Sequence, residues 1–174
     1  MLNELKEEGY KTEIKPKSPF QTKPVFRAFS TQEELLHEIT TDLQNYLYIG
    51  RPEQILCVGL KNGLLEQLYS TLQQALLPVR WATDMSTISG KYILFADFVE
   101  AKGLERDYVF ILDVERLATQ LNMFASAVDH RKILMRDRIK LFVALTRAIR
   151  EIRLYYVDQY HQFVKDLLQL QGKL

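Results

Sequence analysis

The stretch QILCVGLKNGLLEQLYSTLQQALLP, residues 54–78, predicts a buried strand followed by a helix. Its first part, 54–60, is apolar and is bounded by Pro52 and Gly63, as is typical of a strand that is covered on both faces. Leucines then recur at helical spacing until Pro78 ends the pattern. A strand and a helix in direct succession form the repeating unit of an α/β fold.

The same alternation of strands and helices continues on both sides of this stretch. Upstream, 25–29 predicts a short strand, and Ser30 with Glu33 predicts a capping box that opens a helix to about Leu47. Downstream, we expect strands over 92–96, 108–112 and 152–157, a helix over 139–149 and a closing amphipathic helix over 159–170. The sequence therefore predicts an α/β fold with a parallel sheet.

Residues 115–137 give a weaker signal. Apolar residues at helical spacing indicate one helix, namely Leu117, Leu121, Phe124 and Val128. The run DHRK at 129–132 indicates a polar break after that helix.

The composition is that of a single domain. A chain of 174 residues with 47% hydrophobic content has enough apolar side chains for one full-sized core. We expect residues 1–23, rich in Lys, Glu and Pro, to be an extended lead-in from the preceding part of a longer protein, and residues 24–174 to be the domain. The formal charge of +1 assigns no acidic or basic partner.

The sequence indicates an intracellular protein without a metal site. No run approaches the roughly 20 apolar residues that span a bilayer, so we expect no membrane partner. Cys57 is the only cysteine, which excludes a disulfide within the chain and a cysteine-based zinc site, and fits a reducing cytoplasm. The three histidines are far apart and lack metal-ligand spacing, so we expect no metal centre.

The stretch AKGLE, residues 101–105, lies on the connection between two predicted strands. Gly103 permits a positive φ or a close backbone approach, Lys102 supplies a positive charge, and Glu105 offers an acceptor for a ribose hydroxyl. A plain turn between strands uses the same residue types. On spacing alone the turn is the better interpretation.

Basic residues recur around the stretch FVALTRA, residues 142–148, which lies in the predicted helix. Arg136, Lys140 and Arg147 fall along one predicted helical face, with Arg150 one turn beyond. A guanidinium there presents a fixed fork of donors, and in phosphoryl transfer such an arginine stabilises the charge on the transferring oxygens. A solvated basic face is the more common meaning of such a stripe.

Together the two stretches resemble motifs V and VI of the UvrD/Rep-type superfamily 1 DNA helicases, which lie in the second RecA-like motor domain, 2A. Motif V is approximately Thr-x-His-x-Ala-Lys-Gly-Leu-Glu-Phe-Asp, and 101–105 and Asp107 match it. Motif VI is approximately Glu-x-Arg-x-Leu-x-Tyr-Val-Ala-x-Thr-Arg-Ala, and 142–148 match it, with Asp137 in the acidic position. The resemblance covers residues 24–158 and implies a RecA-like sheet flanked by helices on both faces.

The resemblance implies a role for each matched residue. Lys102, Gly103 and Glu105 belong to the nucleotide-binding part of motif V, and Glu105 corresponds to the glutamate that holds the ribose. Arg147 corresponds to the arginine finger, the catalytic arginine that reaches the γ-phosphate across the cleft between the two motor domains.

The implied DNA contacts depart in part from the family pattern. Residues 55–72 resemble motif IVa more loosely, and this match implies that Lys61 and Asn62 lie near single-stranded or duplex DNA. Asp97 and Val99 stand where the family has the Thr and His that help to touch the DNA strand. The grip on DNA through that turn is therefore expected to differ.

One connection in this chain is much shorter than its counterpart in the unwinding members of the family. Only residues 81–90 lie between Arg80 and Lys91, where those members insert a large helical subdomain, 2B, so we expect no 2B insertion. In its short connection and its motif V without Thr-x-His, the chain also resembles helicase-like factors that bind bacterial RNA polymerase and release it from nucleic acid. RNA polymerase is thus a candidate partner.

The chain has no Walker A loop, because none of its glycines has the Gly-x-x-x-x-Gly-Lys-Ser/Thr spacing that cradles phosphates. Without that loop and a metal-binding acid, phosphoryl transfer lacks most of its electrostatic stabilisation. We expect ATP with Mg to bind only together with a missing N-terminal RecA-like domain of the same protein. The full-length protein is then an ATP hydrolase, and the isolated chain is inactive.

Three functions follow from the resemblance. The first is a motor domain of an ATP-dependent DNA helicase or translocase, supplying half of the interdomain ATP site and part of the single-stranded DNA track. The second is a non-unwinding factor that docks on RNA polymerase, and the third is an inactive interaction domain. We interpret Trp81 as a packing residue rather than a base-stacking platform. Asp113 ends an apolar strand, and its position after motif V favours a structural or coupling role.

Overall fold

The computed structural model describes residues 24–83, 90–117, 127–157 and 161–171, and its centre is a six-stranded sheet in the order β1-β6-β5-β2-β4-β3. Every pair of neighbouring strands is parallel. The strands are β1 (Val25–Ala28), β2 (Ile55–Gly59), β3 (Val79–Trp81), β4 (Ile93–Asp97), β5 (Arg106–Ile111) and β6 (Ala148–Tyr156). The predicted α/β fold with a parallel sheet is confirmed. The expected lead-in, 1–23, lies outside the described residues.

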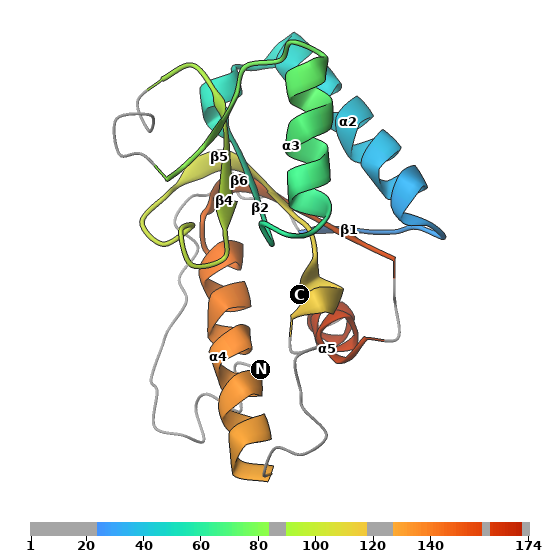
Figure 1. Cartoon of the computed structure of the whole chain (residues 1–174), viewed down its shortest axis with the longest axis vertical. Helices are drawn as coiled ribbons and strands as arrows, with labels where there is room; N and C mark the ends of the chain where they lie inside the picture. The colour runs from blue at the N-terminus through green and yellow to red at the C-terminus, as the bar shows by residue number, and fades with distance from the viewer. Residues whose placement is uncertain (1–23, 84–89, 118–126, 158–160, 172–174) are drawn as a thin grey trace.

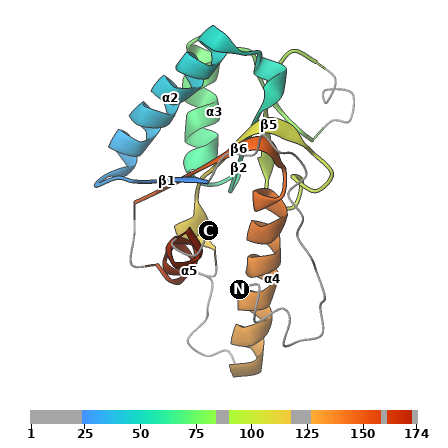
Figure 2. The same ribbon diagram turned by 180° about the vertical axis from the view of Figure 1, so that it is seen from behind.

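The helices in the described part of the chain cover both faces of the sheet (Figure 1, Figure 2). They are α2 (Gln32–Ile49), α3 (Leu64–Gln74), α4 (Ala127–Leu145) and α5 (Gln162–Gln171), with two short 3-10 helices, η1 (Pro52–Gln54) and η3 (Val114–Arg116). Helices α2 and α3 pack on one face, and α4 and α5 lie on the other. This two-sided cover is the arrangement that the sequence predicts for a RecA-like domain.

The alternation of side chains along each strand divides the apolar residues between two cores. In β2, Ile55 and Cys57 pack with α2 and α3, whereas Leu56 and Val58 pack with α4 and α5. All four side chains are buried. A strand that is buried on both faces needs apolar residues at every position, which explains the unbroken apolar run in the sequence.

Helix α2 begins one residue later than its predicted capping box. Thr31, rather than Ser30, is the N-cap, because its hydroxyl accepts from the amide of Glu34 at 3.1 Å. The carboxylate of Glu34, rather than Glu33, accepts from the amide of Ser30 at 3.1 Å. The sequence STQEE supplies a box in either register, so the capping pattern alone does not determine where the helix begins.

The prediction for 115–149 is wrong at two points. The polar run 129–132 does not break a helix, since it lies inside α4, and that helix ends at Leu145 rather than at 149. Residues from Ala148 onward belong to β6, because they pair with β5 instead of continuing the helix. Of the helix predicted across 117–128, residues 118–126 lie outside the described ranges.

The strands of the parallel sheet all begin along one edge and end along the opposite one. All strands run in one direction, so their carboxyl ends lie along one edge and their first residues along the other. Residues 98–105, here called the crossing segment, run from the carboxyl end of β4 to the start of β5, with β2 between these two strands. Phe98, Ala101 and Leu104 are buried in the same core as α4, so the crossing segment passes over the α4 face.

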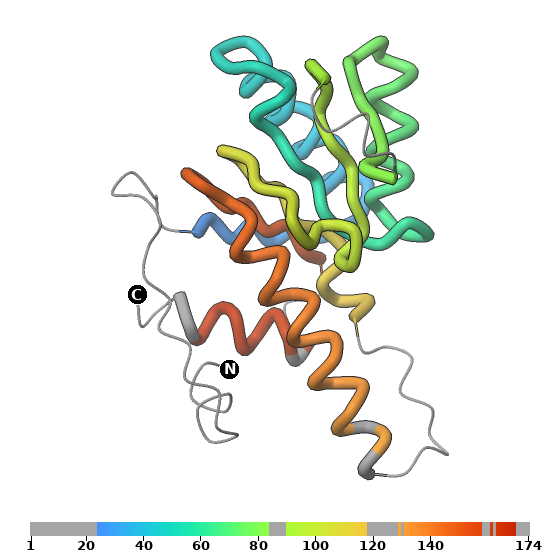
Figure 3. The backbone as a smooth tube through the Cα atoms, turned by 90° about the vertical axis from the view of Figure 1, so that its left-hand side faces the viewer, coloured from blue at the N-terminus to red at the C-terminus, as the bar shows by residue number. Residues whose placement is uncertain are grey.

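Helix α4 meets the sheet with its C-terminal end and projects away from it toward its N-terminal end (Figure 3). Leu141 and Ala144, near its C-terminus, are buried in the core, whereas Arg131 and Lys132 near its N-terminus are exposed. The part of α4 that carries the FVALTRA stretch is therefore the part fixed against the sheet. No helix in the described ranges is long and apolar enough to cross a membrane.

Candidate functional site

The two motif-like stretches meet at the edge formed by the strand starts. The amide of Arg106 donates to the carbonyl oxygen of Arg147 at 3.1 Å, and Arg106 pairs in register with Ala148. Glu105, which precedes β5, is exposed at this edge. The backbone pairing of β5 with β6 thus brings Glu105 and Arg147, which lie far apart in the sequence, to neighbouring positions.

Arg147 lies in the turn between α4 and β6, not on the helix. Its Nε donates to the carbonyl oxygen of Val143 at 3.0 Å, and its Nη2 donates to the hydroxyl of Thr146 at 3.0 Å. The guanidinium therefore caps the C-terminus of α4, where unpaired carbonyl oxygens and the negative end of the helix dipole favour a cation.

The prediction that four basic residues lie along one helical face is wrong for Arg147 and Arg150. Arg136 and Lys140 lie on α4 and both pair with Asp137, whose carboxylate is 3.2 and 2.9 Å away. Arg150 lies on β6, 3.6 Å from Asp107. The helix ends before Arg147, so the four basic residues do not share a face.

Lys102 and Gly103 lie on the exposed outer side of the crossing segment. Gly103 has a φ of +88°, in the left-handed region that favours glycine, and a Cβ added there meets no atom within 4 Å. The turn therefore needs glycine for its backbone conformation, and not because neighbouring atoms of the protein would collide with a side chain. Of the two uses that the sequence suggested for Gly103, the structure shows the positive φ.

The start of the crossing segment is a tight turn held by Asp97. One oxygen of the Asp97 carboxylate accepts from the amides of Val99 and Glu100 at 2.7 and 2.8 Å. The amide of Asp97 in turn donates to the carboxylate of Glu100 at 3.2 Å. Asp97 therefore acts within the protein, as a cap of its own turn.

Lys61 lies at the opposite edge of the sheet from Arg147, beside the carboxyl ends of three neighbouring strands. It follows β2, and its Nζ forms an ion pair with Glu100, which follows β4. The ammonium also lies 6.0 Å from the ring centroid of Trp81, the last residue of β3. Contact with Glu100 raises the pKa of Lys61, so the lysine stays protonated.

Trp81 is a packing residue, as predicted. Its ring lies 5.1 Å from that of Tyr69 on α3 and 5.9 Å from that of Phe95 on β4, and these rings belong to the core under α2 and α3. The indole thus covers the sheet at its β3 edge.

Asn62 is exposed in a loop that buried Asp113 holds in place. The Asp113 carboxylate accepts from the amides of Leu60, Leu64 and Leu65 at 3.1, 2.9 and 3.2 Å. The side chain of Arg116 donates to the carbonyl oxygen of Asn62 at 2.5 Å. The predicted structural role of Asp113 is confirmed: it caps the N-terminus of α3.

The close approach of Asp113 depends on glycine. A Cβ on Gly63 would lie 2.5 Å from Oδ1 of Asp113, which is closer than two such atoms can come. Beyond this loop, a shallow depression of about 560 Å³ runs along α3 and is lined by Asn62, Gly63, Glu66, Gln67 and Ser70. The amides of Leu64 and Leu65 are already bonded to Asp113, so they are not available to an outside anion.

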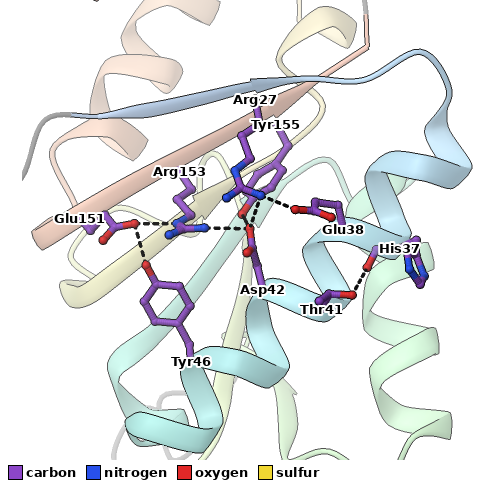
Figure 4. A network of polar contacts seen from close by, with 9 residues as sticks. All are labelled: Arg27, His37, Glu38, Thr41, Asp42, Tyr46, Glu151, Arg153 and Tyr155. Carbon is purple, nitrogen blue, oxygen red and sulfur yellow. Dashed lines mark hydrogen bonds and ion pairs between the residues drawn. The ribbon is translucent and has the colours of Figure 1, made fainter.

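A polar network that was not predicted from the sequence joins α2 to β1 and β6 (Figure 4). Asp42 on α2 accepts from Arg153 on β6 at 2.9 Å and from the hydroxyl of Tyr155. Arg27 on β1 lies 3.4 Å from Asp42, and Glu151 accepts from Arg153 at 2.6 Å. The available signal was a charged residue, Asp42, on the apolar face of the predicted helix.

The described residues do not bring three or more His, Cys, Asp or Glu side chains together in a cluster that could hold a metal ion. The exposed carboxylate of Glu105 fits a ribose hydroxyl, and Arg147 fits a phosphate oxygen. Both residues lie at one edge of the sheet.

Comparison with known proteins bears on the fold. No family model matches the chain, and no curated protein matches it. Among solved structures, the chain is similar to the C-terminal domain of a possible DNA helicase from Lactobacillus plantarum WCFS1. The TM-score is 0.56 and the sequence identity 18%, and the match covers 79% of this chain and 75% of that chain. The chain thus has an α/β fold consistent with a RecA-like domain and shares it with the C-terminal domain of that possible DNA helicase.

Proposed function

We propose that this chain is the second motor domain of an ATP-dependent DNA helicase or translocase of the UvrD/Rep type. One observation carries the proposal: Glu105 and Arg147 occupy neighbouring positions at one edge of the sheet, joined through the bond from the Arg106 amide to the Arg147 carbonyl oxygen. Each residue matches a nucleotide-contacting position of its motif. The similarity in fold to a helicase C-terminal domain supports the same assignment.

In this proposal the chain supplies half of a nucleotide site. Glu105 accepts a hydrogen bond from a ribose hydroxyl, and Arg147 stabilises negative charge on the phosphoryl group that is transferred. A preceding RecA-like domain of the same protein supplies the phosphate-binding loop and the residues that hold Mg. That domain and its nucleotide must draw the Arg147 guanidinium away from the carbonyl oxygen of Val143, its partner at the end of α4.

The DNA strand is assigned to the other edge of the sheet. Lys61 and Asn62 follow β2 there, and their loop is fixed by Asp113 and Arg116. A basic side chain on a rigid loop fits a backbone phosphate, which is contacted without regard to sequence. The nucleotide and the DNA are thus proposed to lie at opposite edges, joined by the crossing segment.

The proposal is tested on the polypeptide that joins this chain to a preceding domain with a Gly-Lys-Thr loop. The measurement is DNA-stimulated ATP hydrolysis. Arg147→Ala is expected to lower turnover by about 10³-fold or more, the usual contribution of an arginine finger. Arg150→Ala, which removes a nearby arginine paired with Asp107, is the matched control and is expected to leave turnover within about twofold.

Two results would overturn the proposal. One is an open reading frame that encodes no phosphate-binding loop upstream of this chain. The other is equal ATP turnover in the Arg147→Ala and Arg150→Ala proteins. Either result would remove the nucleotide role assigned to the strand-start edge.

A second candidate function is docking on RNA polymerase without unwinding. The Asp97 carboxylate, which replaces a DNA-contacting threonine of the family, is bonded to the amides of its own turn. Moreover, β3 and β4 are neighbours joined by residues 82–92, which leave no room for a 2B subdomain. Co-purification with RNA polymerase, together with polymerase release but no strand separation, would favour this candidate over the first.

A further inference from the structure

We propose that Glu100 determines how tightly the carboxyl-end edge of the sheet holds single-stranded DNA, because its carboxylate competes with a DNA phosphate for Lys61. The inference rests on the proposed function in one respect, that DNA is the ligand of this edge. It assigns a role to a residue that stands at a variable position of the motif V pattern.

The carboxylate is positioned to meet the lysine. Glu100 Oε1 pairs with Lys61 Nζ, while Oε2 accepts from the amide of Asp97 at 3.2 Å. The amide of Glu100 donates to Asp97 at 2.8 Å, so both ends of the residue are fixed by the same turn. Trp81 bounds Lys61 on another side, 6.0 Å from the ammonium. Glu100 therefore holds an anionic oxygen where a phosphate oxygen would have to bind.

The contact is weak enough to be displaced. The side chain of Lys61 is 42% exposed and that of Glu100 is 24% exposed. Ion pairs in contact with water contribute little to stability, since water and salt screen them. A nucleic-acid phosphate that approaches Lys61 must either displace Glu100 or lie beside its negative charge. Both outcomes lower affinity relative to a lysine with no acidic partner.

The structure supplies a matched control. Glu66 lies on α3 and lines the depression next to Asn62, so its carboxylate is close to the same edge. It is exposed and belongs to the first turn of its helix. Removing the charge of Glu66 changes the net charge of the protein by the same amount as removing that of Glu100. Only the second change releases Lys61.

The test measures binding of a fluorescein-labelled oligo-dT to the 174-residue chain by anisotropy, over a series of salt concentrations. In single-stranded DNA each phosphate that meets a basic residue adds about 0.7 to the slope of log affinity against log salt. Glu100→Gln keeps an acceptor for the Asp97 amide and is expected to steepen the slope by about this amount and to raise affinity about 3- to 10-fold at low salt. Glu66→Gln is expected to leave the slope unchanged.

Three outcomes would overturn the inference. The first is an unchanged slope in Glu100→Gln, and the second is a gain that persists in the double variant Lys61→Ala with Glu100→Gln. The third is the lack of measurable DNA binding by the chain and all of its variants. ATP turnover by the joined polypeptide is measured separately, so the proposed function stands or fails independently of these results. Thermal unfolding of each variant verifies that the fold is retained.

Discussion

The carboxylate of Asp113 lies 2.9 Å from the amide nitrogen of Leu64, although Asp113 follows β5 and Leu64 opens α3. Asp113 adopts a left-handed backbone conformation, with a φ of +60°, and its side chain is buried. A residue from one strand end thus supplies the N-terminal cap of a helix that follows another strand.

The first prediction is that Asp113→Ala lowers the free energy of unfolding by about 2–4 kcal/mol, because two buried amides and one part-buried amide lose their acceptor. Asp113→Asn keeps one carbonyl oxygen and is expected to cost about half as much. The measurement is urea unfolding followed by circular dichroism. Glu66→Ala, an exposed carboxylate in the first turn of the same helix, is expected to change stability by less than about 0.5 kcal/mol. Equal effects at Asp113 and Glu66 would contradict the capping role.

The second prediction concerns Tyr155, whose pKa is raised by burial and by its hydrogen bond to Asp42. A group whose pKa is raised in the folded state gives its full stabilisation below its ordinary pKa, about 10 for tyrosine, and loses it as the pH rises further. We expect the free energy of unfolding of the wild-type protein to exceed that of Tyr155→Phe by about 1 kcal/mol at pH 7.

That difference is expected to shrink above about pH 10, because only the wild-type protein must keep Tyr155 protonated to stay folded. Urea titrations of both proteins between pH 7 and pH 11 measure it. The pKa of Tyr46 is raised in the same direction, but it is present in both proteins and cancels in the comparison. A difference that grows at alkaline pH would contradict the predicted sign.

The third prediction concerns the single thiol. Cys57 is fully buried in β2, and burial raises its pKa, so the reactive thiolate is scarce in the folded protein. We expect Ellman's reagent at pH 8 to label native protein at least about 10³-fold more slowly than protein in denaturing urea. Rapid labelling of the native protein would show that β2 opens far more readily than its position between β5 and β4 implies.

The fourth prediction is that the purified 174-residue chain shows no steady ATP turnover above background. Its sequence contains no phosphate-binding loop, and an arginine without that loop and its Mg has no transferring phosphate to stabilise. A coupled assay with saturating ATP and Mg measures the rate. Turnover that disappears in Arg147→Ala would contradict the prediction, whereas turnover shared equally by that variant would indicate a contaminating enzyme.

The three-residue strand β3 was not predicted. The central strands were predicted well, because they are buried on both faces and therefore appear as unbroken apolar runs. The β2 run and the run that became β4 are examples. The boundary between α4 and β6 was predicted less well. Residues 139–149 continue an apolar, helix-compatible composition past Leu145, with no glycine or proline to mark the end. The helix ends there because β5 pairs with the following residues, a contact that local patterns do not contain.

The candidate site residues stay a prediction, and their arrangement in space could not be predicted from the sequence. The resemblance of AKGLE and FVALTRA to two helicase motifs led to the prediction of Glu105 and Arg147, and the strand pairing places their backbones at neighbouring positions. The sequence could not reveal that Glu100 pairs with Lys61, because the two residues follow different strands and meet only when β2 and β4 pair. The network around Asp42 and Arg153 was missed for the same reason.

The crossing segment has a mechanical consequence for the whole domain. It begins at the turn that carries Glu100 and ends at Glu105, so a single short piece of backbone spans the sheet from edge to edge. Its buried side chains, Phe98, Ala101 and Leu104, belong to the core that also contains Leu141 and Ala144 of α4, and they anchor the segment to the domain. Glu105 and the turn that carries Glu100 are therefore held at a fixed separation, one at each end of the strands.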